Sequence, residues 1–167
     1  MVILGIDPGY AIVGWGIVRY ESNHFKTLDY GAVTTPAGMH FSDRLEKIFD
    51  GIDYLLDTYK PDAMSIEKLF FNTNQKTAID VAQARGVILL AAKKAGVDIF
   101  EYTPLQVKQS VVGYGRAEKK QVQEMTRIIL NLNAVPKPDD TADALALAIC
   151  HGHASGSLLG RLEKLQR

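Results

Sequence analysis

Four carboxylates stand where a helix or a strand does not ordinarily place one. Asp7 ends the apolar run at residues 2–6, and Glu67 ends a second run at residues 63–66. Asp140 and Asp143 precede an apolar segment at residues 144–149. Carboxylates at the ends of buried elements lose hydration and repel one another unless a cation lies between them. If the four meet in space, they suit a magnesium-dependent site that cleaves phosphodiesters.

Each carboxylate also has an ordinary structural explanation. Asp7 precedes a Pro-Gly pair, and aspartate commonly starts turns. Glu67 could simply leave its strand into solvent. Asp140 and Asp143 are three residues apart and share a helical face, where the first turn of a helix favours negative charge. Two carboxylates on one face and two at strand ends nevertheless match oxygen ligation of Mg²⁺ or Mn²⁺.

The bulk properties are those of an ordinary soluble domain. The chain has 167 residues, of which 47% are hydrophobic and 23% charged, enough for one domain with a proper core. No apolar run reaches the roughly 18 residues of a membrane span, and no secretory leader is recognised. The single cysteine, Cys150, excludes an internal disulfide and suits a reducing compartment. We therefore expect a cytoplasmic protein.

The charges are unevenly distributed although the net charge is zero. Residues 1–67 hold 5 basic and 10 acidic side chains, whereas residues 68–167 hold 14 and 9. The second part of the chain can therefore present a local basic surface to a polyanion.

The best candidate for that surface surrounds the Gly-Tyr-Gly segment at residues 113–115. Lys108, Arg116, Lys119 and Lys120 flank it. A helix that begins near residue 117 would also offer backbone amides to a phosphate. The alternative interpretation is an ordinary solvated helix face.

Two further pairs of residues are less decisive. Phe70 and Phe71 follow Glu67 in an expected loop, where one could stack on a base and at least one should pack in the core. His151 and His153 are two residues apart and cannot share a helical face, which disfavours paired metal ligation. We expect structural or surface positions for both histidines.

The order of elements predicts one α/β domain with a mixed sheet. Three closely spaced strands favour an antiparallel meander, and helices and strands then alternate. From residue 155 onward, glycine and serine lead into a polar tail that we expect to be peripheral. The expected strands are residues 2–6, 11–20, 24–35, 62–67 and 97–102, and the expected helices begin near residues 42, 72, 103, 117 and 139.

The helix expected at residues 77–94 is apolar around nearly its whole circumference. Such a helix is either central or buried between the core and another chain. In a domain this small, the pattern favours a subunit interface.

Several segments together resemble the RuvC family of Holliday-junction resolving endonucleases. They occur in the family's order and spacing across about residues 1–155. The segments are Gly-Ile-Asp-Pro-Gly at 5–9, Ile-Glu at 66–67, Gln-Ala-Arg-Gly-Val at 83–87, Gln-Val-Lys-Gln at 106–109, Val-Val-Gly at 111–113, Ala-Glu-Lys at 117–119 and Ala-Asp-Ala-Leu-Ala at 142–146.

This resemblance implies a ribonuclease-H-like fold, with a mixed five-stranded sheet flanked by helices, over residues 1–155. The tail at 156–167, which we expect to be peripheral from its composition, departs from the family's pattern. It implies a homodimer that binds a four-way DNA junction in recombination and repair and nicks two strands of like polarity symmetrically. The products would carry 5′-phosphate and 3′-hydroxyl ends. A branch-migration complex of RuvA and RuvB is the implied partner.

The resemblance also implies roles for individual residues. The four carboxylates match the family's metal-binding acids, which would share two Mg²⁺ ions, with Mn²⁺ as a possible substitute. Phe70 matches an aromatic residue that stacks on a base, and Lys108 and Lys119 match basic residues near the scissile backbone. Lys119 could neutralise charge that develops on the phosphate. Arg85, in the expected interface helix, is an interface or core ion-pair candidate.

Three alternatives remain at this level. A nuclease of the same fold that acts on RNA or RNA–DNA hybrids would use the same acids but need not be a symmetric dimer. A non-catalytic junction-binding protein would not respond to Mg²⁺. An actin-like phosphotransferase also begins with a strand, an aspartate and a glycine turn, but it needs two lobes, and this chain supplies only one.

Overall fold

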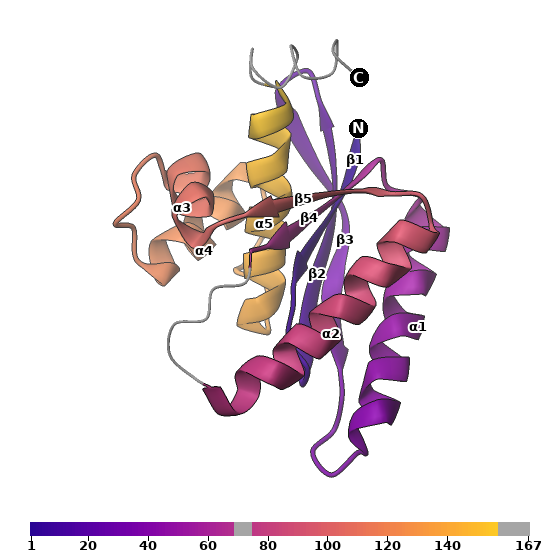
Figure 1. The fold of residues 1–167 in the computed structure, drawn as a ribbon. Helices are drawn as coiled ribbons and strands as arrows, with labels where there is room; N and C mark the ends of the chain where they lie inside the picture. Colours follow the sequence, from indigo (N-terminus) through magenta and orange to yellow (C-terminus); the bar gives the residue numbers. More distant parts are fainter. Residues whose placement is uncertain (69–74, 157–167) are drawn as a thin grey trace.

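The first three strands form the predicted antiparallel meander, and two parallel strands extend the sheet. Figure 1 shows the computed structural model, which describes residues 1–68 and 75–156. The strand order β3-β2-β1-β4-β5 places β1 at the centre, with β4 parallel to β1 and β5 parallel to β4. The predicted mixed five-stranded sheet is therefore confirmed. The strands are β1 (Val2–Asp7), β2 (Ile12–Glu21), β3 (His24–Thr34), β4 (Ala63–Glu67) and β5 (Asp98–Tyr102).

Helices cover both faces of this sheet. α1 and α2 lie on one face, whereas α5 packs on the other, with α3 and α4 beyond it (Figure 1). Each expected helix is found, with ends shifted by a few residues. The helices are α1 (Phe41–Tyr59), α2 (Gln75–Lys94), α3 (Pro104–Val112), α4 (Lys119–Ile129) and α5 (Asp139–Gly156).

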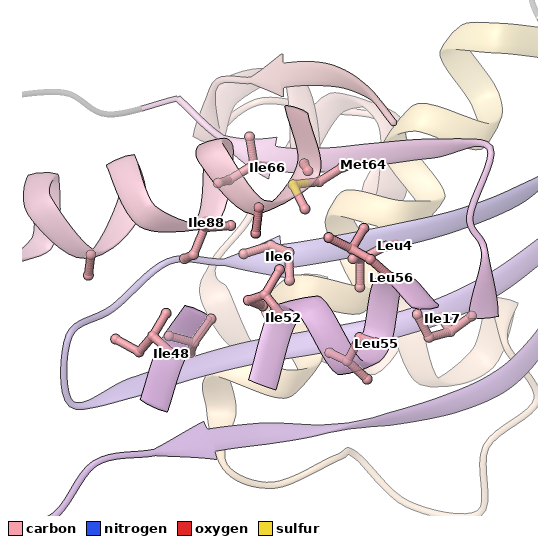
Figure 2. Close-up of a cluster of buried hydrophobic side chains, with 14 residues drawn as sticks. Leu4, Ile6, Ile17, Ile48, Ile52, Leu55, Leu56, Met64, Ile66 and Ile88 are labelled. Carbon is pink, nitrogen blue, oxygen red and sulfur yellow. The ribbon is translucent and has the colours of Figure 1, made fainter. Parts of the chain in front are cut away.

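The larger hydrophobic cluster fills the space between the sheet and α1 and α2 (Figure 2). The helical spacing of apolar residues in α1 has its expected result, because Ile48, Ile52 and Leu56 all point into this cluster. Met64 and Ile66 of β4 enter it from the sheet. Full burial of one such side chain contributes roughly 1.5–3 kcal/mol, so this layer holds the ends of β1 and β4 firmly in place.

The second cluster lies between the sheet and α5, where the helix backbone comes unusually close to the strands. A methyl group on Gly5 would overlap the carbonyl of Ala144, and one on Gly14 would overlap the carbonyl of Asp140. Glycine at these two strand positions therefore admits α5 to the sheet at the distance observed. This close approach brings the start of α5 beside the end of β1.

The helix α2 is less uniformly covered than its composition suggests. Ala84, Ile88 and Ala91 are fully buried against the core, but Ile79 is 67% exposed and Leu90 is 55% exposed. Gln83 and Gly86 are exposed between those two residues. We call Ile79, Gln83, Gly86 and Leu90, which recur at helical spacing, the exposed α2 face. Its function as a subunit interface stays a prediction.

The start of α4 differs from the expectation. The helix begins at Lys119, and Glu118 caps it through a capping box with Gln121. The side chain of Glu118 accepts a hydrogen bond from the backbone amide of Gln121, and Gln121 Oε1 accepts one from the amide of Glu118 at 2.8 Å. The cap uses the amide of Gln121, and binding of a phosphate by the other amides of this first turn stays a prediction.

The described part of the chain ends with α5, the last expected helix. α5 extends to Gly156, so the expected peripheral tail at 156–167 lies almost wholly outside the described residues. Within the described ranges, no helix is long and apolar enough to cross a membrane.

Candidate active site

The sheet itself brings Asp7 and Glu67 to the same edge. Asp7 is the last residue of β1, and β4 runs parallel beside it with Ile6 in register with Ile66. Glu67 is therefore one step beyond the last paired position of the neighbouring strand. Since the carboxyl ends of adjacent parallel strands open on the same side of a sheet, the two carboxylates lie at the same edge.

The first turns of α5 supply the other two carboxylates. Two hydroxyl groups fix the helix on the sheet, because Thr141 Oγ1 donates to the carbonyl of Gly31 at 3.0 Å and Ser65 Oγ donates to that of Leu147 at 2.7 Å. Gly14, whose missing side chain admits the helix, pairs directly with Asp7 in the sheet. Asp140 and Asp143 therefore lie over the end of β1.

The electrostatics of Asp7 indicate that the other three carboxylates lie close enough to affect it. Burial, followed by the charges of Glu67, Asp143 and Asp140 in that order of importance, raises the pKa of Asp7 to about 8. The ammonium of Lys119 opposes this rise. Asp7 is thus the most strongly perturbed of these acids, and perturbed carboxyl groups in a crevice are typical of functional sites.

Glu67 and Asp143 respond to the same surroundings. Burial, followed by the charge of Asp143, raises the pKa of Glu67. Burial also raises the pKa of Asp143, against the opposing hydrogen bond and charge of Lys119. The sequence-based expectation that the acids would lose hydration and repel one another is therefore met.

Lys119 lies in the cluster as its cationic partner. Its Nζ atom is 2.8 Å from Asp143 Oδ2 and 3.8 Å from Asp139 Oδ2. The hydrogen bond to Asp143 raises the pKa of Lys119, so the side chain remains an ammonium at neutral pH. Sequence comparison suggested a phosphate contact for Lys119 but not this ion pair.

Asp139, unlike its neighbours Asp140 and Asp143 in α5, is surrounded mainly by lysines. It contacts Lys137 Nζ at 2.5 Å, and this hydrogen bond lowers the pKa of Asp139. It therefore faces the lysines at the rim of the cluster. It shares Lys119 with Asp143, and its charge also contributes to the raised pKa of Asp143.

The donor chemistry of the cluster fits a hard divalent cation. Four carboxylates, of which at least three have a raised pKa, would be relieved of burial and repulsion by an ion among them. In their present positions, no three acidic, histidine or cysteine side chains of residues 1–68 and 75–156 form a group that could hold a metal ion. Ligation therefore requires the carboxylates to turn and Asp143 to separate from Lys119. The metal-binding function of the four stays a prediction.

The other expected DNA contacts lie on α3, near the start of α4 or outside the described residues. Lys108 is partly buried on α3, whereas Arg116 and Lys120 are exposed in the connection to α4 and in its first turn. Their contact with DNA is untested. Phe70 lies outside the described residues.

His151 is more deeply placed than a surface residue. It is 3% exposed, its ring stacks on Phe100 at 4.2 Å between centroids, and its Nδ1 atom is 2.8 Å from the hydroxyl of Tyr102. His153 is exposed and contacts Ser110 at 3.1 Å. Of the two expected positions, structural or surface, His151 therefore has the structural one, and its contacts with Phe100 and Tyr102 connect α5 to β5.

Fold and cluster together define a nuclease-like site on a ribonuclease-H-like sheet, and the comparisons with known proteins agree. The family model described as "Crossover junction endodeoxyribonuclease RuvC" matches residues 3–151. A protein of that name from Ruminiclostridium cellulolyticum is 64% identical over 162 residues, which cover 96% of this chain and 98% of that protein.

Two solved structures agree with the computed one over most of its length. The Thermus thermophilus RuvC structure has a TM-score of 0.85 and 37% identity, covering 92% of this chain and 95% of that chain. The T. thermophilus RuvC in complex with Holliday junction substrate has a TM-score of 0.84 and 35% identity, with the same coverage. The chain therefore belongs to the RuvC family of crossover junction endodeoxyribonucleases.

Proposed function

We propose that this protein resolves four-way DNA junctions, in recombination and repair, by paired and symmetric metal-dependent nicks. The observation that carries the proposal is the meeting of Asp7, Glu67, Asp140 and Asp143 at one edge of the sheet, with coupled electrostatics. Family membership supports the substrate, since a relative has been solved with a Holliday junction. The products are strands with 5′-phosphate and 3′-hydroxyl ends.

In this proposal the four carboxylates hold two Mg²⁺ ions, which Mn²⁺ can replace. When bound, the ions supply Lewis-acid stabilisation of the scissile phosphate and a nucleophilic water at neutral pH. Burial keeps the carboxylates in a poorly hydrated crevice, which strengthens every charge interaction there. The ammonium of Lys119, released from Asp143, can then neutralise charge that develops on the phosphate.

Basic residues beside the crevice position the DNA. Lys108, Arg116 and Lys120 lie on α3, on its connection to α4 and on α4. Each can neutralise a backbone phosphate, which sets register without reading sequence. Phe70, three residues after Glu67, is assigned to stacking on a base near the crossover.

The paired nicks require two active sites related by symmetry. We assign the exposed α2 face to the interface of a homodimer, because Ile79 and Leu90 present large apolar surfaces there and Gly86 has open space above it. The two-fold axis of such a dimer can coincide with that of the junction. A branch-migration complex of RuvA and RuvB is the proposed partner.

We also place the protein in the cytoplasm. Cys150 is buried and free, and burial raises the pKa of its thiol to about 11, so it remains a protonated, unreactive thiol. A buried, free thiol suits a reducing compartment, as we propose for this protein.

A cleavage assay with three substrates tests this function. A synthetic four-way junction, a linear duplex and an RNA–DNA hybrid are incubated with the protein in Mg²⁺ and in EDTA. The proposal predicts nicks confined to the junction and only in Mg²⁺. Preferential cleavage of the hybrid would instead assign the same site to a different nuclease, and binding without cleavage would leave a junction-binding protein.

A further inference from the structure

We propose that Arg85 of α2 is a positioning residue that fixes the backbone at Glu67. The inference rests on the proposed function, in which Glu67 is a metal ligand. The Nε atom of Arg85 donates to the backbone carbonyl of Glu67 at 3.4 Å, and its Nη2 atom forms an ion pair with Glu101 of β5. Arg85 does not itself belong to the carboxylate cluster.

These contacts hold one peptide group from both sides. The carbonyl of Glu67 and the amide of Lys68 belong to the same planar unit. Arg85 binds the carbonyl, and the amide of Lys68 donates to the carbonyl of Tyr102 at 2.8 Å. This unit lies where the β4–β5 ladder ends, with Glu67 in register with Tyr102. The orientation of the backbone at Glu67, and hence the direction in which its carboxylate can point, is therefore fixed by Arg85 and β5 together.

The guanidinium is well placed for this role because it is almost completely enclosed. The Arg85 side chain is 13% exposed, whereas its partner Glu101 is 44% exposed. A planar guanidinium can bind a carboxylate and a carbonyl at the same time with fixed geometry, which an ammonium cannot do. The ion pair with Glu101 thus orients the Arg85 guanidinium, and the guanidinium in turn binds the carbonyl of Glu67 at the end of β4.

The position of Arg85 in α2 connects two parts of the proposed mechanism. The same helix carries the exposed α2 face, at Ile79, Gln83, Gly86 and Leu90. A shift of α2 when two copies associate would reach Glu67 directly through Arg85. In the proposed dimer, this contact would connect the interface helix to Glu67.

A matched pair of substitutions tests the positioning role. Arg85→Gln removes both contacts, and Arg127→Gln serves as the control. Arg127 also bridges a carboxylate and a backbone carbonyl, since it contacts Glu124 at 2.6 Å and the carbonyl of Leu132 at 3.1 Å, but at the far end of α4. Each substitution therefore removes an arginine that binds one carboxylate and one backbone carbonyl, but at different positions in the fold.

The primary measurement is Mn²⁺ binding to the DNA-free protein by calorimetry, followed by the Mg²⁺ concentration that half-saturates junction cleavage. Loss of a residue that orients a metal ligand typically weakens ion affinity by about 10- to 100-fold. We expect that loss in Arg85→Gln, with junction binding in EDTA unchanged, and wild-type ion affinity in Arg127→Gln. Equal ion affinity in wild type and a folded Arg85→Gln would overturn the inference.

Two further variants decide the question if Arg85→Gln does not fold. Glu101→Gln keeps the bond from Arg85 to Glu67 and removes only the ion pair, so Mn²⁺ affinity should be retained even if the melting temperature falls. Arg85→Lys keeps the charge but loses the fork, so Mn²⁺ should bind more weakly than to Glu101→Gln. The reverse order would show that the ion pair with Glu101, and not the bond to the carbonyl of Glu67, governs ion affinity, and would overturn the positioning role.

The wild-type protein separates this inference from the function on which it rests. If wild type binds no Mn²⁺ and cleaves nothing, the proposed function and the role of Arg85 both fail. If wild type binds Mn²⁺ and cleaves junctions while Arg85→Gln has the same ion affinity, only the positioning role fails.

Discussion

Asp7 and the three carboxylates beside it should favour activity and lower the stability of the metal-free protein. Burial and three nearby carboxylates raise the pKa of Asp7 to about 8, so the metal-free fold is strained by any charge at this position. Active sites commonly hold groups that oppose folding in this way. The same acids that we assign to catalysis should therefore reduce the stability of the metal-free protein.

Asp7→Asn should separate these effects. With a folded pKa of about 8, Asp7 must take up a proton on folding at neutral pH, a cost that the amide does not have. We therefore expect the metal-free melting temperature to rise by roughly 2–4 °C for each kcal/mol gained. Cleavage of the junction should fall to background. Calorimetric melting in EDTA measures the first effect, with Asp53→Asn on the exposed surface of α1 as a matched control. A large fall in melting temperature would argue against the carboxylate cluster.

The pH dependence of stability follows from the same shift. The folded pKa of Asp7 lies above the ordinary value of 3.8, so the folded state retains a proton that the unfolded state has released between these values. The stabilising contribution is complete below about pH 4 and disappears as pH rises towards 8. We expect the melting temperature in EDTA to fall across this window, and to fall less in Asp7→Asn. The same slope in both proteins would contradict the assignment.

At the scale of elements, local sequence patterns were sufficient to predict the strands and helices and their order. Strand runs that end at Asp7 and Glu67, the helical spacing of Ile48 and Ile52, and the Thr103-Pro104 helix start all had their expected outcome. Each of these signals depends on neighbours within a few positions.

Contacts between distant elements could not be read in the same way. The ion pair between Lys119 and Asp143, the bond from Arg85 to Glu67 and the burial of His151 each join segments 16 or more residues apart, and no local pattern encodes them. The acids were predictable because a carboxylate at the end of an apolar run is locally unusual. Their partners have ordinary sequence surroundings.

The close packing of α5 on the sheet predicts the effect of one added methyl group. Gly14→Ala would place that methyl against the backbone of Asp140 and push the start of α5 away from Asp7. Overpacking of this kind costs about 1–3 kcal/mol. We expect a lower melting temperature and a loss of cleavage, measured beside Arg19→Ala, an exposed position on the same strand. Full activity in Gly14→Ala would show that the site tolerates displacement of α5.

At the scale of the whole molecule, the proposed pairing of the nicks depends on the exposed α2 face as a dimer interface. The double variant Ile79→Glu and Leu90→Glu should place like charges across the proposed interface. Central interface residues often contribute about 2 kcal/mol or more, so dimer dissociation should become roughly 30-fold more favourable or greater. Sedimentation measures this shift. Tyr54→Glu is the control, because Tyr54 is 68% exposed on α1. A dimer unaffected by the double variant would place the interface elsewhere.

In the proposed dimer, each chain contributes one of two symmetry-related active sites. One sheet supplies one carboxylate cluster, and a four-way junction presents two equivalent strands for cleavage. A symmetric pair of chains can match them, whereas a single site would cut one strand and leave the junction joined.

The most direct measurement follows both strands of one junction at once. Two strands of like polarity carry different labels, and the junction is incubated with wild type or Asp7→Asn, first in EDTA and then in Mg²⁺. We predict that wild type alone cuts both labelled strands, at symmetric positions, only after Mg²⁺ is added, and leaves ends that a ligase can seal. Cutting of a single strand, or cutting by wild type in EDTA, would contradict a paired, metal-dependent carboxylate site.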